Sequence, residues 1–157
     1  MMPTLSNKTF GEIAIGDAAL AQRALQAGDL RAWAAAFGES GEAGGPDASQ
    51  AAAGIVTAML TALVGSDLPG PGSAIRAISV QLKGALPVAA ALSIRLSVRE
   101  KRGGLGIVIL DGQCMDPAGL VVATATLEVL ASAVRQQRQV EAHRLEELIE
   151  RCHDLEP

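Results

Sequence analysis

The sequence predicts an α+β fold in which one long central helix is wrapped by a curled antiparallel β-sheet. Three observations support this prediction: residues 50–64 are almost entirely apolar, a period of two begins after Ser73, and short turns separate the periodic segments. A helix that is apolar on all sides is expected to be buried on all sides. Consecutive strands joined by short turns pair antiparallel. The simplest packing lays the helix along the concave face of the sheet.

The N-terminal part is expected to supply a strand and a helix before the central helix begins. Residues 9–15 fit either a short strand or a loop, and residues 19–24 fit a second short strand. The Ala-rich segment 30–37 favours helix, and Asp29 stands where an N-cap residue is expected.

The central helix has clear boundaries in the sequence. Residues 38–49 contain four glycines and one proline, which is typical of a loop. The helix is expected from Gln50 to about Gly65. The segment Leu68-Pro-Gly-Pro-Gly-Ser73 cannot continue a helix and is expected to form a tight connection.

The second half of the chain shows the pattern of strands. Apolar and polar residues alternate over 78–83 and again over 92–99, so each of these strands should have one face in water. Residues 105–110 are apolar throughout and predict a central strand. A turn is expected at 116–119 and a last strand at 121–129.

Beyond Ser132 the composition becomes polar. Residues 136–139 are interpreted as a linker, and residues 141–152 as a short amphipathic helix. The prediction is therefore a domain over 1–132 and a separate segment over 133–157 that lies outside the sheet core.

Composition narrows the possible functions. A chain of 157 residues that is 49% hydrophobic and 19% charged can bury a core and is not intrinsically disordered. A net charge of −4 argues against a nucleic-acid partner or an anionic membrane surface. No long apolar run or signal-peptide pattern is present, and two cysteines do not make a disulfide framework, so we expect no membrane partner and a cytoplasmic location.

Several segments together resemble a known family. The run Thr9-Phe-Gly-Glu-Ile-Ala-Ile-Gly-Asp17, the helix at Met59-Leu60, the Leu68–Ser73 segment and residues 116–130 resemble the MaoC-like hot-dog hydratases, over residues 7–131. More narrowly, the chain resembles the N-terminal domain of bifunctional enoyl-CoA hydratase/phosphate acetyl- or butyryltransferases. Residues 143–152 are similar to the helix that opens their phosphate acyltransferase domain.

The resemblance implies a fold, a chemistry and partners. The fold would be the hot-dog, in which a curled sheet wraps a long helix, assembled as a homodimer or higher homo-oligomer. The family hydrates a trans-2-enoyl-CoA to the (R)-3-hydroxyacyl-CoA. An Asp and a His in an Asp-x-Asn-Pro-x-His loop act on one water, and a backbone N–H beside the Gly of a His-Gly-Met sequence polarises the thioester carbonyl. No cofactor is implied, and the ligand would be an acyl-CoA.

The sequence departs from the family at each of these points. Glu39 stands where the resemblance expects the Asp, and Gly44 stands where it expects the His. The His-Gly-Met sequence is replaced by Thr57-Ala58-Met59. Both histidines, His143 and His153, lie in the last fifteen residues, so the globular part contains no imidazole base.

These departures leave two hypotheses. The first is a degenerate, non-catalytic module that dimerises or binds acyl-CoA beside a C-terminal phosphate acyltransferase. The second is an active (R)-specific enoyl-CoA hydratase or hot-dog thioesterase that uses a loop carboxylate, Glu39, Glu42 or Asp47, as its base. Two points argue against the second hypothesis. A glycine-rich loop holds catalytic groups poorly, and carboxylates are also expected in a loop that is simply exposed to solvent.

The resemblance also suggests binding residues on the helix and one strand. Thr57, Ala58 and Met59 would face the acyl thioester, although a threonine in a buried helix more often bonds the carbonyl one turn back. Arg95 and Arg99, on the polar side of their strand, would meet the CoA phosphates or would be solvated.

The remaining reactive side chains favour structural interpretations. Cys114 lies in an expected strand with no base at a fixed spacing, which favours a buried thiol over a nucleophile. Cys152, His143 and His153 do not have the spacing of a tetrahedral metal site, so no metal is predicted.

Overall fold

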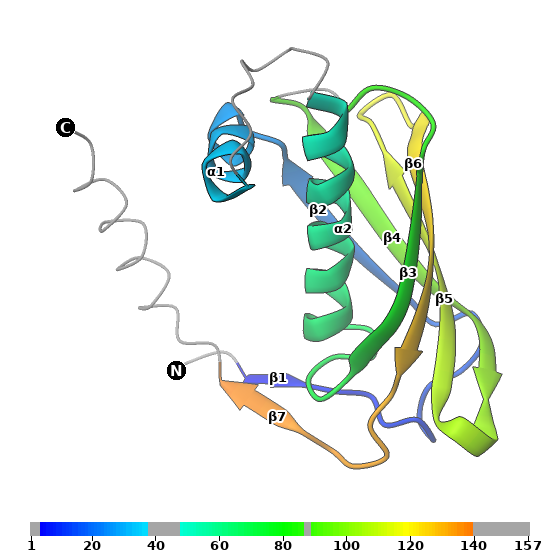
Figure 1. The fold of residues 1–157 in the computed structure, drawn as a ribbon. Helices are drawn as coiled ribbons and strands as arrows, with labels where there is room; N and C mark the ends of the chain where they lie inside the picture. Colours follow the sequence, from blue (N-terminus) through cyan, green and yellow to red (C-terminus); the bar gives the residue numbers. More distant parts are fainter. Residues whose placement is uncertain (1–3, 38–47, 87–88, 140–157) are drawn as a thin grey trace.

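The computed structural model describes residues 4–37, 48–86 and 89–139, and it shows one long helix lying across a curled five-stranded sheet (Figure 1). The expected tail helix at 141–152 and the expected loop at 38–47 lie outside the described residues. The element order within them is strand, strand, helix, helix and then five more strands, with one short 3₁₀ turn. The α+β class predicted from the sequence is confirmed.

The main sheet is antiparallel throughout. Its spatial order is β2-β4-β5-β6-β3, so β2 and β3 form its two edges. The strands are β2 (Ala18–Ala24), β3 (Ala74–Leu82), β4 (Ala91–Arg102), β5 (Ile107–Met115) and β6 (Val121–Leu130). The turn η1 (Gly103–Leu105) joins β4 to β5.

The alternation in the sequence sorts the sheet into two faces. Leu92, Ile94, Leu96 and Val98 of β4 are buried toward the helix, and the polar residues between them are not. The same holds for Ala123, Ala125, Leu127 and Val129 of β6. The wet face and the apolar face predicted for residues 92–99 are therefore confirmed.

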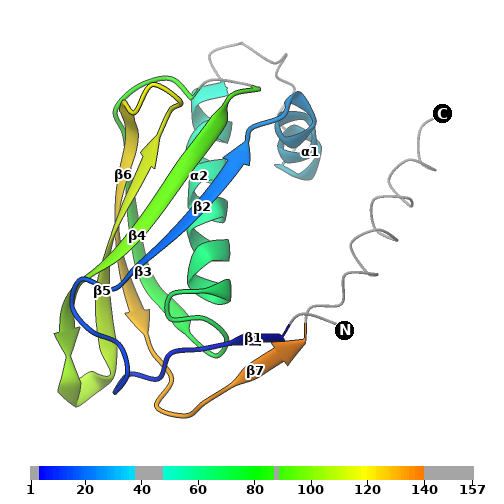
Figure 2. The same cartoon turned by 180° about the vertical axis from the view of Figure 1, so that it is seen from behind.

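The long helix α2 (Ala48–Ser66) lies on the concave face of this sheet (Figures 1 and 2). Val56, Leu60 and Val64 are almost completely buried between α2 and the strands. Burial on all sides, expected from the apolar sequence, is wrong for one flank: Ala58, Thr61 and Ala62 are exposed. An alanine hides so little surface that an Ala-rich helix can keep one open flank at small cost.

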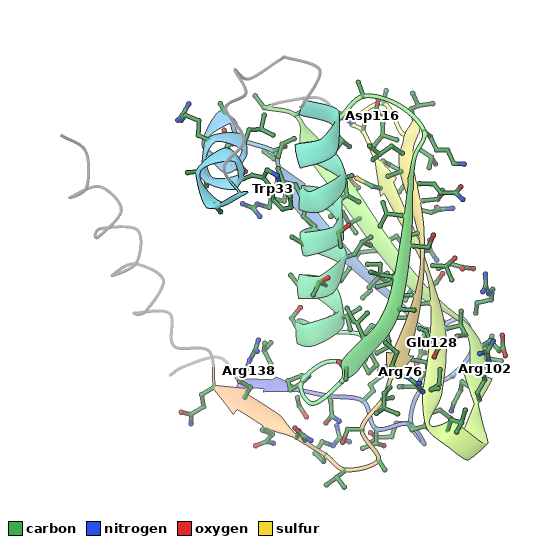
Figure 3. The ribbon with its side chains drawn as sticks, viewed as in Figure 1. Trp33, Arg76, Arg102, Asp116, Glu128 and Arg138 are labelled. Atoms are coloured by element: carbon green, nitrogen blue, oxygen red, sulfur yellow. The ribbon has the colours of Figure 1, made fainter. Side chains whose placement is uncertain are left out.

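The shorter helix α1 (Ala27–Phe37) packs beside the first half of α2 (Figure 1). Asp29 was expected to be its N-cap, but it is the third residue of the helix. Its carboxylate still serves the helix start, because Oδ2 accepts a 2.9 Å hydrogen bond from the backbone N–H of Gln26. The Trp33 side chain reaches from α1 toward α2, as Figure 3 shows. A Cβ at Gly54 of α2 would come within 2.0 Å of the Trp33 ring, so Gly54 provides the space for this contact.

The two ends of the described chain meet under the C-terminal end of α2. Strand β1 (Thr4–Ser6) pairs antiparallel with β7 (Gln137–Gln139) to form a second, two-stranded sheet. Residues 9–15 form turns and loop, the second of the two expected possibilities. The interpretation of 136–139 as a linker is wrong, since three of these residues form β7. Their partner β1 lies at the opposite end of the described chain, so no local pattern could reveal this pairing.

Candidate functional site

The loop to which the family resemblance assigns the catalytic residues lies outside the described residues. Glu39, Glu42 and Asp47 all fall between the end of α1 at Phe37 and the start of α2 at Ala48. Their role as catalytic carboxylates therefore stays a prediction. The structure does describe both elements that flank this loop, and a candidate site can be built from them.

Thr57 and Ala58 lie in the middle of α2 rather than at its start. Thr57 is the tenth residue of the helix that begins at Ala48. Backbone N–H groups at such positions already bond the carbonyl four residues back, and only the first four of a helix are free. The Thr57 hydroxyl donates a 2.8 Å hydrogen bond to the Ala53 carbonyl. This is the bond to the preceding turn that the sequence suggests as the alternative to a contact with substrate. Ala58 is exposed.

Met59 does line a pocket. A cavity of about 240 Å³ opens between β2, β4 and the second half of α2. Its apolar wall consists of Ala21, Met59, Ala62, Leu63 and Ile94, and its polar lining of Gln22, Arg23 and Ser66. Pockets that enclose a whole small ligand usually have about 300–1,000 Å³. This one has room for part of a larger molecule.

The pocket exists because small side chains face each other across it. In the β2–β4 pairing, Ala21 stands opposite Ile94, whose side chain is buried toward α2. Residues opposite each other in a strand pair share one face of the sheet, so Ala21 faces the helix as well. Ala21 on the strand and Ala62 on α2 leave unfilled the space that larger residues would occupy.

Arg95 and Arg99 lie on the other face of the sheet. Both are exposed residues of β4: Arg95 stands between buried Ile94 and Leu96, and Arg99 follows buried Val98. Arg99 donates a 2.9 Å hydrogen bond to Asp111 of β5. The sheet therefore separates the two arginines from Thr57, Ala58 and Met59. The five expected binding residues do not line one common site in this chain, and their binding roles stay predictions.

A second hollow, of about 260 Å³, lies on that outer face beside Asp111. Its lining is almost wholly polar and comes from β3, β5 and β6: Ser79, Gln81, Asp111, Gly112, Gln113, Thr124, Ala125 and Thr126. At the far end of the same sheet, Arg76 and Arg102 lie 3.8 Å and 3.7 Å from the Glu128 carboxylate (Figure 3). These groups pair with each other across strands in the manner of a solvated sheet face.

Cys114 is a buried structural thiol, as the sequence predicts. It is 1% exposed and belongs to the main core. Burial raises the pKa of its thiol to about 11, so the thiol stays protonated and poorly nucleophilic at neutral pH. Within residues 4–37, 48–86 and 89–139, no group of three or more His, Cys, Asp or Glu side chains is arranged to hold a metal ion.

No helix among the described residues is long and apolar enough to cross a membrane.

Sequence reasoning missed the pocket beside β2, although a signal was present. Residues 19, 21 and 23 are Ala, Ala and Arg on alternate positions of a predicted strand. Two alanines on the inner face of a strand predict unfilled space beside it, and an arginine there predicts a polar end to that space. The pattern can be interpreted only once it is known which face of the strand is inward.

Comparison with known proteins identifies the fold. No protein-family profile matches the chain, and no curated protein is detectably similar to it in sequence. Among solved structures, the R-hydratase PhaJ1 from Pseudomonas aeruginosa is similar, with a TM-score of 0.77 and 21% identity, over 88% of this chain and 94% of that one. A MaoC-like dehydratase from Rhodospirillum rubrum is similar with a TM-score of 0.58 and 19% identity, over 80% and 97% of the two chains. A protein of Streptococcus mutans bound to acetyl CoA is similar with a TM-score of 0.53 and 10% identity, over 76% and 86%.

The chain therefore has the hot-dog fold of the MaoC-like hydratases. The hot-dog arrangement that the resemblance in sequence implied is confirmed at the level of the fold. A fold hosts many activities, so the activity of this chain has to be argued from its own residues.

Proposed function

We propose that this chain is a degenerate MaoC-like hot-dog domain that binds a short acyl-CoA without hydrating it. The observation that carries the proposal is the pocket beside Met59. It has apolar walls suited to an acyl chain, and the residues that line it within the described part of the chain include no histidine, aspartate or glutamate. The structurally similar protein of Streptococcus mutans that is bound to acetyl CoA supports this class of ligand.

Hydration of an enoyl thioester requires a group that takes a proton from water. General acid–base catalysis contributes about 10²- to 10⁴-fold to a rate. The histidine that the resemblance expects is replaced by Gly44, which has no side chain to accept a proton. A missing backbone donor at Thr57-Ala58 would remove a further factor of about 10².

The proposal includes self-association and a place in a larger protein. The edges of the main sheet, β2 and β3, are unpaired within the described chain, and unpaired edges are commonly protected by pairing or covering. We propose a homodimer that organises a C-terminal phosphate acyltransferase domain of a bifunctional cytoplasmic enzyme. Light scattering at micromolar concentration should give twice the mass of one chain, and the mass of a single chain would contradict the dimer.

Two measurements test the ligand and the absence of catalysis. Titration calorimetry should show butyryl-CoA binding more tightly than free CoA, because only butyryl-CoA carries a chain for the pocket. Incubation with crotonyl-CoA should leave the enoyl-thioester absorbance unchanged over an hour, beside a protein-free control. Turnover above about 1 per second that is lost in Glu39→Gln would contradict the proposal and establish the loop-carboxylate enzyme instead.

A pair of matched variants tests the position of the ligand. Ala62 is exposed and lines the pocket, whereas Ala58, one turn earlier on the same flank, is exposed and does not line it. Ala62→Leu should weaken butyryl-CoA binding by filling the pocket, and Ala58→Leu should not. Equal binding by both variants would place the acyl chain elsewhere.

A further inference from the structure

One end of the acyl pocket carries a cation on the helix-facing side of the sheet. In the β2–β4 register, Arg23 stands opposite Leu92, which is completely buried toward α2. Opposite residues share a face, so β2 presents Ala19, Ala21 and Arg23 inward. Arg23 is one of the residues that line the pocket.

The guanidinium of Arg23 is oriented by a carboxylate of α1. Its Nη2 donates a 2.6 Å hydrogen bond to Oδ1 of Asp29, at the start of α1. Asp29 Oδ2 in turn accepts a hydrogen bond from the N–H of Gln26. A guanidinium has five N–H donors, and among the described residues Asp29 accepts from one of them. The Arg23 side chain is 57% exposed, which leaves this end of the pocket open to a ligand.

From this arrangement we infer that the pocket selects acyl groups that end in a carboxylate, that is, CoA thioesters of short dicarboxylic acids. The inference rests on the proposed binding of acyl-CoA and adds the class of acyl group. The methylene groups lie against Met59 and Leu63, and the terminal carboxylate lies against Arg23. A guanidinium matches a carboxylate in both charge and planar geometry.

Asp29 sets the strength of this selection. Its carboxylate orients Arg23, yet its negative charge also repels an incoming carboxylate. Removing that charge while keeping the oxygen that accepts the Gln26 N–H should therefore strengthen the preference for an anionic chain. Asp29→Asn makes this change.

A structural role for Arg23 makes a different prediction. Inward-pointing charges protect the edge strands of sheets from pairing with other chains. A purely protective Arg23 would affect association and stability, and it would not distinguish two ligands that differ only at the end of the acyl chain.

Butyryl-CoA and succinyl-CoA provide such a pair, because a carboxylate replaces the terminal methyl group. We expect succinyl-CoA to bind about fivefold more tightly at low salt, the size expected for one partly exposed ion pair, with the ratio falling as salt is added. Arg23→Gln should bring the ratio to one, because the ends of the two acyl chains then meet the same uncharged side chain. Arg23→Lys should retain part of the ratio, and Asp29→Asn should raise it.

The control variant is Arg138→Gln, which removes the same charge from the exposed strand β7 and should leave the ratio unchanged. Equal affinity for the two thioesters in the natural chain, or a ratio that survives in Arg23→Gln, would overturn the inference and leave the proposed function standing. Failure of butyryl-CoA to bind would overturn both. Thermal unfolding of each variant checks that it is folded.

Discussion

The two ends of helix α2 are held in different ways. At the C-terminal end, polar groups from distant parts of the sequence bond one another. Asn7, the buried polar side chain among the described residues, is 1% exposed. Its amide donates to the Val134 carbonyl at 3.0 Å and accepts from the Gln136 N–H at 2.7 Å. We call this set of bonds the Asn7 clasp.

The clasp is completed by the segment that ends the helix. The Lys8 N–H donates to the Pro69 carbonyl at 2.8 Å, and the Gly70 N–H donates to Val64 in the last turns of α2. Gly70 has φ of +98°, and a Cβ there would lie 3.0 Å from the Asn7 backbone. Only glycine fits this position without strain.

The first half of α2 is held by apolar packing against α1, where Trp33 fits against Gly54. Open space lies further along the helix, where the pocket beside Met59 opens between β2, β4 and the second half of α2. Arg23 lines this pocket and pairs with Asp29 of α1. The clasp therefore uses its polar groups to close the fold, whereas the side of α2 that faces β2 keeps unfilled volume and a charged side chain.

The largest expected effect comes from breaking the clasp. Asn7→Ala removes two hydrogen bonds: the Gln136 N–H loses its Asn7 acceptor, and the Val134 carbonyl loses its Asn7 donor while it retains the Ser132 hydroxyl. This should cost about 2–3 kcal/mol of unfolding free energy. For a domain of this size that lowers Tm by about 4–12 °C. Urea unfolding measures the loss. A change within error would show that water replaces Asn7 and that the clasp adds little stability.

A smaller loss is expected from filling the space under Trp33. In Gly54→Ala the new methyl group must displace the Trp33 ring, at a cost of about 1–3 kcal/mol, reduced because Ala favours helix over Gly. Tryptophan fluorescence should shift, since Trp33 is the one tryptophan of the chain. Gly65→Ala, in the same helix with no atom within 4 Å of the new Cβ, is the matched control and should be neutral or stabilising.

Two truncations define where the clasp ends. Removal of residues 140–157 should leave Tm unchanged, because the clasp and the β1–β7 pairing are both made by residues up to Gln139. Removal of 136–157 also deletes β7 and the Gln136 N–H, and should lower Tm by about 2–4 °C while unfolding stays cooperative. Calorimetry compares the two truncated proteins. Equal Tm values would show that β7 does not contribute to stability. Aggregation of the protein that ends at Gln139 would contradict the expectation that residues 140–157 can be removed without effect.

The smallest effect is a pH dependence at the edge of the clasp. The Thr9 backbone N–H and hydroxyl bond the Glu12 carboxylate at 2.8 Å and 2.9 Å, and with Arg135 they lower the pKa of Glu12 below its usual value. A lowered pKa in the folded state adds stability above the unfolded pKa of about 4.3, and that stability is lost as pH falls through the folded pKa.

Glu12→Gln should therefore lower Tm slightly at pH 7, and the difference from the natural chain should shrink below about pH 4. Thermal melts from pH 7 to pH 2.5 make the comparison. A constant difference across this range would mean that the charge of Glu12 does not contribute to stability.

Much of the fold could be predicted from local patterns. The apolar run before Leu68-Pro69 determines a long buried helix, because no other structure hides such a segment between a glycine-rich loop and a proline stop. The alternation at Leu92–Arg99 determines a strand with one wet face. Both were predictable since each depends on residues a few positions apart.

The candidate site could be predicted only in part. Met59 was identified through the family resemblance and does line the pocket, whereas Arg95 and Arg99 lie on the opposite face of the sheet. The alternation of β4 predicted that these arginines face water, but it could not place the ligand on either side. Whether Glu39, Glu42 or Asp47 acts on a substrate is still a prediction.

The sequence by itself determined the class of fold, the approximate boundaries of its long helix and the absence of histidine before residue 143, because these depend on single residues or on residues a few positions apart. Only the tertiary structure decided that Asn7 joins Val134 and Gln136 across more than 120 residues, and that Ala21, Arg23 and Ala62 surround one pocket. Such pairings depend on how the strands order themselves in the sheet. That order is fixed by the packing of the whole core, and no local pattern encodes it.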